Sequence, residues 1–377
     1  MPFDPSGRGT RGAVVALVPR AQTHASEHER CTLRLFVRRL AALKGWDDGG
    51  SFDPVRAAGP LYFVPSCTLH REEADTLGIR GPDGLFGGVV PESFVATKAI
   101  SHPLVAPDAS APAEWNNGFA QRVGDAVLEG YSVFSREDVQ VAGERLLARG
   151  PLRAKPVRAT GGRDQQVVRD AAALRALIEG LDLDELREHG LVLEENMEDV
   201  TTFSVGLVQV DDLTASYHGV QKLTPGHDGQ QVFGGSDLTV ARGGFEALLA
   251  TDLAPDVRRA VEQARRYEDA VRACYPGFYA SRRNYDILVG RDASGRRRSA
   301  VLEQSWRAGG ATGAELAALE LFRAEPGRDR VRTCTVELFG ESPEPPDGAT
   351  VYFRGVDHDV GPLTKYAMVL KDDVDAR

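Results

Sequence analysis

The pattern of apolar and polar positions predicts an α/β unit at the start of the chain. A short apolar run at 13–18 predicts a buried strand, and apolar residues at helical spacing predict a helix over 28–46. The Gly-, Pro- and Asp-containing stretch 47–60 predicts a loop. Beyond it the pattern predicts a strand at 61–66, a helix at 70–79 and a third strand within 81–91. This alternation favours a small open α/β domain.

The middle of the chain mixes helical and strand patterns. Residues 92–104 have the spacing of a helix, and the Ala-, Pro- and Asp-rich residues 106–118 predict a loop. Further along, the sequence predicts helices at 119–129, 136–149 and 170–190, and strands at 152–159, 167–170 and 191–198. A turn that contains Gly161 and Gly162 separates the first two of these strands.

The second half of the chain is expected to be rich in strands. Residues 201–241 show mostly strand patterning, and residues 283–306 predict a β-hairpin around the turn Asp-Ala-Ser-Gly. Further elements are predicted as helices at 254–277 and 310–322 and as strands at 332–340 and 349–355. The predicted units of the chain are residues 1–95, 96–200, 201–330 and 331–377.

The composition is that of a folded, soluble protein. Of the 377 residues, 42% are hydrophobic and 27% are charged, and the formal net charge is −10. A general nucleic-acid binder needs a basic face to neutralise phosphates, so we expect no nucleic-acid partner. No stretch approaches the roughly 18 apolar residues of a membrane helix, so we expect a cytoplasmic protein without a membrane partner. The four cysteines lie far apart and predict no zinc or redox motif.

Lysine is scarce, which draws attention to the few lysines that are present. Arginine outnumbers lysine 39 to 6, so a lysine kept in an apolar or Gly-rich setting indicates a role that a bulky guanidinium cannot fill. Lys155 lies in a predicted strand directly before the loop that contains Gly161 and Gly162. A compact cation beside the backbone N–H groups of a glycine loop suits a phosphate. An ordinary strand-edge lysine beside a hairpin is the alternative interpretation.

Paired acids occur at two other places in the chain. Glu194 and Glu195 follow an apolar strand, where a hinge could present backbone and carboxylate groups to adenine; a solvated acidic turn is the alternative. Asp286 and Glu303 lie on the two arms of the predicted hairpin, and each is flanked by apolar residues. Two carboxylates on facing strands can hold a hard cation such as Mg²⁺, and otherwise they would face solvent.

Arg307 follows this hairpin and precedes a Gly-rich helix start. The arginine and the first N–H groups of the helix suit an anion such as a phosphate or a carboxylate. The alternative is an arginine that caps the end of the hairpin. Lys222, on a predicted strand with Tyr217 and His218, either lines the same cleft or lies at the surface. His102, near Lys98, has the pattern typical of a helix surface.

The order of these features resembles the ATP-grasp superfamily. A strand lysine with a glycine loop comes first, then an acidic hinge, then a two-acid hairpin followed by an arginine, over roughly residues 92–325. The resemblance implies an ATP-grasp fold of α/β and α+β type, with a preceding small open α/β (pre-ATP-grasp) domain over 1–95. Residues 96–200 and 201–330 would be its two subdomains, and 331–377 a β-rich C-terminal extension. The segments LFGGVVPESFVATKAISHPL and LEQSWRAGGATGAE also resemble an uncharacterised bacterial family of ATP-grasp-like proteins.

The resemblance also implies roles for individual residues. The residues expected to bind the nucleotide are Lys98, Lys155, Gly161, Gly162, Glu194, Glu195 and the backbone of Met197. The expected ligands of Mg²⁺ are Asp286, Glu303 and Ser305, and the expected catalytic residues are Lys155 and Arg307. Ser305 departs from the usual Glu-x-Asn-x-Arg pattern, which weakens the case for a second metal ion. Thr201 stands where a ribose-binding acid is expected.

The implied reaction is an ATP- and Mg²⁺-dependent ligation. A small-molecule or peptide carboxylate would be activated as an acyl phosphate and then attacked by an amine. A small-molecule kinase and a non-catalytic nucleotide-binding module remain alternatives. A biotin carboxylase-like role is a fourth, although the sequence shows no biotin attachment motif. The resemblance leaves a homodimer open.

Overall fold

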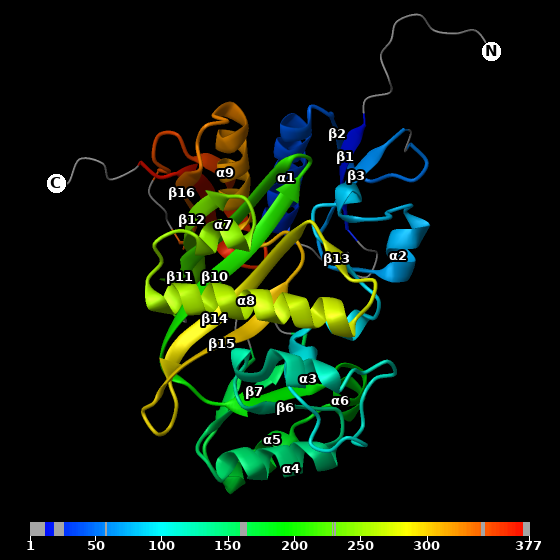
Figure 1. Cartoon of the computed structure of the whole chain (residues 1–377), viewed down its shortest axis with the longest axis vertical. Coiled ribbons are helices and arrows are strands. Elements are labelled where there is room, and N and C mark those ends of the chain that lie inside the picture. Colours follow the sequence, from blue (N-terminus) through cyan, green and yellow to red (C-terminus); the bar gives the residue numbers. More distant parts are fainter. Residues whose placement is uncertain are drawn as a thin grey trace, which may run out of the picture.

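The first part of the chain folds around a parallel three-stranded sheet. The computed structural model describes residues 12–18, 26–56, 59–158, 164–227, 229, 231–340 and 344–371. Strands β1 (Ala13–Leu17), β2 (Asp47–Ser51) and β3 (Leu61–Pro65) pair in the order β2-β1-β3, and helix α1 (Glu27–Lys44) lies between the first two in sequence. In Figure 1 these elements lie at the top of the molecule.

Strand β2 shows that the prediction of a loop over 47–60 was wrong at its start. The strand is mostly exposed and polar, so its composition resembles that of a loop. Backbone pairing to β1 makes it a strand, and Gly49 permits the close approach. A Cβ atom on Gly49 would lie 2.7 Å from Val15 Cγ1.

A second small sheet joins this unit to a much later part of the chain. Strand β4 (Leu69–His70) pairs with β5 (Gly88–Val90), and β5 pairs with β13 (Tyr279–Ala280). Helix α2 (Arg71–Thr76) and the 3₁₀ turn η2 (Pro82–Gly84) lie between β4 and β5. The predicted third strand therefore exists, but it belongs to a different sheet from β1 and β3.

The helix predicted over 92–104 is wrong. The segment forms two 3₁₀ turns, η3 (Ser93–Ala96) and η4 (Lys98–Ser101), separated by extended backbone at Thr97. Gln304 donates its side-chain amide to the carbonyl oxygens of Val95 (3.1 Å) and Thr97 (2.7 Å). A continuous helix would need these two carbonyls for its own hydrogen bonds, so the tertiary contact overrides the local pattern.

The described residues between 118 and 195 include a layer of helices that packs on a small sheet. Its antiparallel sheet has the order β6-β9-β7-β8 and consists of β6 (Gly130–Val133), β7 (Leu152–Pro156), β8 (Gln166–Val168) and β9 (Leu191–Glu195). The helical elements are α3 (Gly118–Val123), η5 (Gly124–Ala126), α4 (Arg136–Leu147), α5 (Ala171–Glu179) and α6 (Leu183–His189). We call β6–β9 with α4–α6 the small lobe, which lies at the bottom of Figure 1. Its core contains Val139, Leu174 and Leu193.

The rest of the chain is built on one large sheet. Its eight strands are antiparallel neighbours in the order β15-β14-β10-β11-β12-β16-β18-β17. They are β10 (Glu198–Val210), β11 (Leu213–Pro225), β12 (Gln231–Arg242), β14 (Arg282–Arg291), β15 (Arg297–Ser305), β16 (Arg330–Phe339), β17 (Thr350–Asp357) and β18 (Gly361–Val369). The C-terminal strands β16–β18 thus continue the sheet that carries the hairpin β14–β15.

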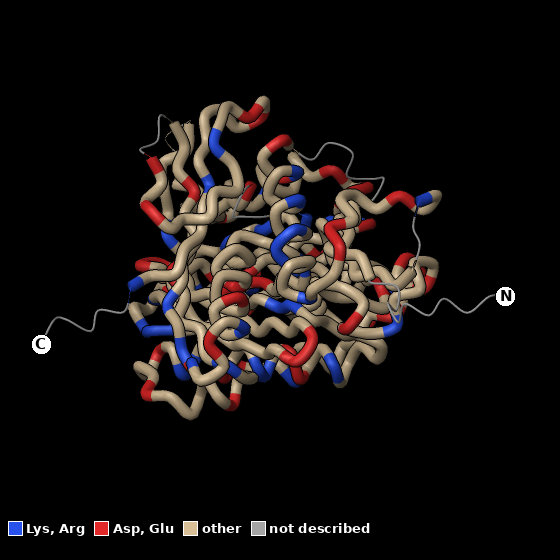
Figure 2. The backbone as a smooth tube through the Cα atoms, turned by 90° about the horizontal axis from the view of Figure 1, so that it is seen from above, with Lys and Arg blue, Asp and Glu red and all other residues tan. Residues whose placement is uncertain are grey.

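Helices cover this sheet in two places. Helices α7 (Phe245–Leu249) and α8 (Pro255–Cys274) share a core with β10, β14 and β15. Helix α9 (Thr312–Ala324) packs on β16 and β18 and also contacts α1, so the N-terminal unit and the large sheet share one core. In the described residues, no helix is both long and apolar enough to cross a bilayer. Figure 2 shows acidic and basic positions interspersed along the backbone in the view from above.

Candidate functional site

A cleft of about 520 Å³ runs between the small lobe and the large sheet. Seven of the residues predicted from the sequence line it: Lys155, Glu194, Met197, Asp286, Glu303, Ser305 and Arg307. They come from β7, the end of β9, the link between β9 and β10, the hairpin β14–β15 and the segment before α9. Lys98 does not line the cleft itself but pairs with Glu303. Gly161 and Gly162 lie outside the described residues.

Asp286 and Glu303 stand directly opposite each other on β14 and β15. Asn284 and Ser305, the next residues on the same face of the two strands, are also opposite each other. Burial raises the pKa of the Asp286 carboxyl, and the charge of Glu303 raises it further, to about 6. Asn284 Nδ2 donates to Asp286 Oδ1 at 2.8 Å. The strand pairing therefore places four side-chain oxygen groups at one end of the hairpin.

These groups fit a hard divalent cation. Carboxylate, amide and hydroxyl oxygens are the ligands that Mg²⁺ accepts in proteins, usually with waters and substrate phosphates completing the shell. Two negative charges held close together in a half-buried site raise the free energy of the folded protein when no ligand is bound. A cation bound between them lowers this free energy. Among the described residues, no cluster of three or more His, Cys, Asp or Glu side chains is arranged for a metal. Asp286 and Glu303 thus fit Mg²⁺ only with further ligands from outside the chain.

Lys98 is placed beside this pair by the turn η4. Its Nζ lies 2.8 Å from Glu303 Oε2, and the lysine is only 6% exposed. The sequence placed Lys98 near the phosphates of a nucleotide, and the structure places it beside the predicted metal ligand.

A second buried ion pair forms the opposite wall. Lys155 on β7 pairs with Glu194 Oε1 on β9, and the other oxygen of Glu194 lies 3.2 Å from His102 Nε2. Burial tends to raise the pKa of Glu194, but Lys155 and His102 outweigh it and hold this pKa at about 2. The prediction that His102 lies on a helix surface is wrong, because its side chain is 2% exposed and contacts Glu194.

One end of the cleft contains Arg307, which lies in the segment between β15 and α9. Among the described residues, no acidic side chain lies within ion-pair distance of Arg307, whose Nη1 donates to Ala308 O at 3.0 Å. Burial lowers the pKa of Arg307, and the neighbouring Arg282 lowers it further. A cation that is costly to bury without a partner favours an anionic ligand at this position.

A buried network that no sequence pattern predicted lies beneath this end. Arg282 is 1% exposed, and its Nη2 lies 2.7 Å from Glu315 Oε1 on α9. Its Nη1 donates to Ser305 O (3.2 Å) and to Arg307 O (2.6 Å). The Tyr217 hydroxyl contacts Glu315 (2.6 Å) and Asn284 (2.9 Å). No local signal in the sequence pairs Arg282 with Glu315, because the contact joins a strand to a helix far along the chain.

An apolar slot adjoins the charged walls. Met197, Val200, Leu288 and Leu302 line the cleft, and Met197, Leu288 and Leu302 belong to one apolar cluster. A planar aromatic base suits such a slot. Thr201 lines another pocket instead, and its neighbour Thr202 lines the cleft.

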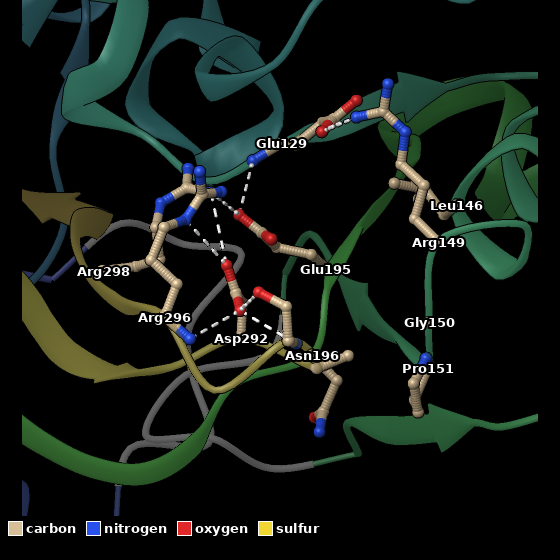
Figure 3. A pocket seen from close by; sticks show the side chains of 12 residues that line it. Glu129, Leu146, Arg149, Gly150, Pro151, Glu195, Asn196, Asp292, Arg296 and Arg298 are labelled. Atoms are coloured by element: carbon tan, nitrogen blue, oxygen red, sulfur yellow. Dashed lines mark hydrogen bonds and ion pairs between the residues drawn. The ribbon is translucent and has the colours of Figure 1, made fainter.

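Glu195 points away from the cleft into a charged pocket of about 200 Å³ at the turn of the hairpin (Figure 3). Arg298 Nη1 lies 3.2 Å from Glu195 Oε1 and 4.0 Å from Asp292 Oδ2. We call Glu195, Asp292, Arg296 and Arg298 the turn cluster. It links the small lobe to the hairpin, so Glu195 pairs with Arg298 outside the cleft, whereas its neighbour Glu194 pairs with Lys155 at the cleft.

The strand β11 carries the remaining candidates. Tyr217 is fully buried, whereas the side chain of Lys222 is 53% exposed and pairs with Asp237 at 2.8 Å. Neither Lys222 nor His218 lines the cleft, and the surface alternative is therefore the observed one for Lys222.

Three enzymes are among those whose solved structures resemble this chain. The biotin carboxylase domain of Hydrogenobacter thermophilus 2-oxoglutarate carboxylase, a dimer in complex with MgADP, ADP and bicarbonate, matches with a TM-score of 0.54 at 11% identity, over 96% of this chain and 86% of that chain. N5-carboxyaminoimidazole synthase from Aspergillus clavatus, in complex with ADP and 5-aminoimidazole ribonucleotide, matches with a TM-score of 0.50 at 11% identity, over 96% of this chain and 94% of that chain. Phosphoribosylamine–glycine ligase from Thermotoga maritima matches with a TM-score of 0.50 at 15% identity, over 95% of this chain and 91% of that chain.

These similarities show an ATP-grasp fold, which confirms the fold class predicted from the sequence. The chain belongs to the family described as "Protein of unknown function (DUF3182)", whose model matches residues 16–367. A comparison with curated proteins finds no match.

Proposed function

We propose that this protein is an ATP- and Mg²⁺-dependent ligase that activates a carboxylate for attack by an amine. The observation that carries the proposal is the convergence on one cleft of Lys155, the pair Asp286 and Glu303, and Arg307, from four separate parts of the chain. Phosphoryl transfer needs this combination of cations and metal-binding acids, because the protein contributes mainly positioning and charge stabilisation.

Each wall of the cleft has a part in the proposed binding mode. The apolar slot around Met197 and Leu288 suits adenine, with Lys155 at the phosphates. Asp286 and Glu303 would hold Mg²⁺, which would offset the charge of the phosphates when bound. Arg307 would bind the carboxylate substrate, because its guanidinium can donate parallel hydrogen bonds to both oxygens.

The proposed reaction proceeds in two displacements. A carboxylate oxygen attacks the γ-phosphorus, the bond to the β–γ bridging oxygen breaks, and ADP leaves. The amine then attacks the acyl carbon, its C–O bond to phosphate breaks, and the amine loses a proton as the amide forms. Lys155 and Arg307 would stabilise the negative charge during transfer, and the chain needs no nucleophile of its own.

The test is the release of ADP and phosphate from ATP in a screen of carboxylic acids against amines. We expect release to require both substrates and to fall by at least about 100-fold in Lys155→Ala and Glu303→Ala. Lys222→Ala is the matched control, because this lysine is half-exposed and lies outside the cleft. Turnover in Lys155→Ala equal to that of the wild type would contradict the assignment.

The product pattern distinguishes the alternatives. A stable phosphorylated product formed without an amine would identify a kinase. Nucleotide binding by calorimetry without turnover in the whole screen would identify a non-catalytic nucleotide-binding module. The same cleft residues would serve in each case, so these outcomes would change the reaction and not the site.

A further inference from the structure

The Lys155–Glu194 ion pair has a third member that no sequence pattern indicated. His102 Nε2 lies 3.2 Å from Glu194 Oε2, on the side of the carboxylate opposite Lys155. Both His102 and Glu194 are 2% exposed. Among the described residues, the Nδ1 atom of His102 has no hydrogen-bond partner, so Glu194 is the polar contact of the ring.

The backbone of the small lobe is shaped to receive this imidazole. Gly130 on β6 lies directly opposite Glu194 on β9. A Cβ atom on Gly130 would stand 2.6 Å from Leu193 O and 2.9 Å from both Glu194 Cβ and His102 Nδ1, and each of these distances is too short for a real contact. A glycine at this position therefore leaves the space that the ring occupies beside the carboxylate.

The segment that carries His102 is also held from the small lobe. Ser132 N donates to Pro103 O at 3.0 Å, and Ser132 Oγ donates to Ala99 O. On the other side, Ser101 Oγ lies 3.0 Å from the Tyr267 hydroxyl on α8. The segment that carries His102 is thus hydrogen-bonded to the small lobe on one side and to α8 on the other.

We propose that His102 is a positioning residue, which holds the Glu194 carboxylate in one orientation so that Lys155 presents its ammonium group to the cleft. A carboxylate held at one oxygen can turn about its last bond, and a lysine can follow it through four rotatable bonds. A second hydrogen bond to the other oxygen removes this freedom in a buried place, where each charged hydrogen bond is strong. The role of Lys155 at a phosphate rests on the proposed function, whereas its placement by His102 does not.

The first experiment measures the reactivity of the Lys155 amine directly, without a nucleotide. The full-length protein is acetylated with a low concentration of acetic anhydride, and the labelling rate of each lysine is read by peptide mass spectrometry. In His102→Leu we expect Lys155 to react roughly tenfold faster, because one charged hydrogen bond of the cluster is lost. Lys44, whose side chain is 3% exposed and lies in the N-terminal unit, reports general loosening of the fold.

Conservative substitution separates positioning from packing. His102→Gln keeps an N–H donor at similar reach, so we expect Lys155 labelling within about threefold of the wild type. His102→Asn is polar but too short to reach Glu194, so it should behave like His102→Leu and serves as the second variant if the leucine protein does not fold. Unchanged Lys155 labelling in His102→Leu and His102→Asn, or an equal rise at Lys44, would overturn the proposal.

The second experiment connects this placement to ligand binding. ADP and adenosine are titrated by calorimetry into the wild type and the three variants. We expect His102→Leu to weaken ADP binding roughly tenfold and adenosine binding less than about twofold, because Lys155 would contact only the phosphates. Equal weakening of both ligands would indicate a packing role and contradict the proposal. A wild-type protein that binds no ADP would instead refute the proposed function and leave the labelling result valid.

Discussion

The two ends of the hairpin β14–β15 hold acidic residues in opposite surroundings. At the cleft end, Asp286 faces Glu303, and burial together with this second carboxylate raises the pKa of Asp286. At the turn, Asp292 accepts hydrogen bonds from Ser294 Oγ (2.6 Å) and from the backbone N–H groups of Ser294 and Arg296 (3.0 Å each). These contacts, led by the Ser294 hydroxyl, lower the pKa of Asp292 to about 2.

The difference shows which carboxylates have their charge balanced by basic side chains of the protein itself. In the turn cluster, Glu195 and Asp292 are matched by Arg296 and Arg298, so the charges are balanced within the protein. At the cleft end, Lys98 pairs with Glu303, but within the described part of the chain Asp286 accepts hydrogen bonds only from neutral donors. Acids left under electrostatic strain in a cleft are typical of a functional site, because a ligand can relieve the strain.

Removing a cleft acid should have the largest effect. Glu303→Gln keeps the shape but removes the charge, and we expect turnover in the ligase assay to fall by at least about 100-fold. Mn²⁺ binding, followed by electron paramagnetic resonance in the presence of ADP, should weaken in parallel. Asp292→Asn on the same hairpin is the matched control and should keep turnover within about threefold. Equal losses in both variants would remove the distinction between the two ends.

Neutralising Asp286 should stabilise the metal-free protein at neutral pH. Its pKa is raised from 3.8 to about 6 in the folded state, so the folded protein holds a proton that the unfolded chain releases. The free energy of unfolding should therefore fall as pH rises from about 4 to 6, by up to roughly 3 kcal/mol, and stay low above that range.

Asp286→Asn should abolish this pH dependence. The free energy of unfolding is measured by urea unfolding with EDTA at pH 4.5 and pH 7.5. We expect wild type and variant to differ in this free energy only at pH 7.5. Glu315→Gln, a buried acid outside the hairpin, is the comparison variant. A variant less stable than the wild type at pH 7.5 would show that Asp286 is not strained.

Replacing Asp292 should affect stability and not turnover. Asp292→Ala removes the acceptor of two backbone N–H groups in the tight turn, and we expect the melting temperature to fall by a few degrees. Scanning calorimetry at pH 7 measures the change. Because the pKa of Asp292 is lowered, the stabilisation should be present above about pH 4 and be lost as pH falls towards 2. A turnover defect larger than the stability defect would contradict this prediction.

The smallest effect is expected for the contact between the turn cluster and the small lobe. Arg298→Met removes the ion pair with Glu195. Both side chains of this pair are about one-fifth exposed, so we expect the free energy of unfolding to fall by roughly 0.5 kcal/mol. Urea unfolding with and without 0.5 M NaCl tests it, since salt should weaken the wild type towards the variant. A loss above about 2 kcal/mol would show that the two lobes depend on this contact.

Much of the site could be predicted from the sequence because its chemistry follows local patterns. The recognisable turn places Asp286 and Glu303 on the two arms of one hairpin. Regular pairing from the turn would set Asp286 opposite Leu302, and a register shift between Ile287 and Asp286 brings Glu303 opposite it instead. Lys155 was singled out by its apolar strand and its scarcity as a lysine. Glu195 shows the limit of this reasoning, because adjacent residues on a strand point to opposite faces and only Glu194 reaches the cleft.

The sequence by itself determined most of the order of strands and helices, the hairpin that carries the two acids, and the strand lysine, since each depends on neighbours within a few residues. Only the tertiary structure decided the rest. Gln304 breaks the predicted helix at 92–104, His102 reaches Glu194, and Arg282 pairs with Glu315 across the core. These contacts join residues far apart in the chain, and their free energy depends on burial and partner geometry that no local pattern specifies.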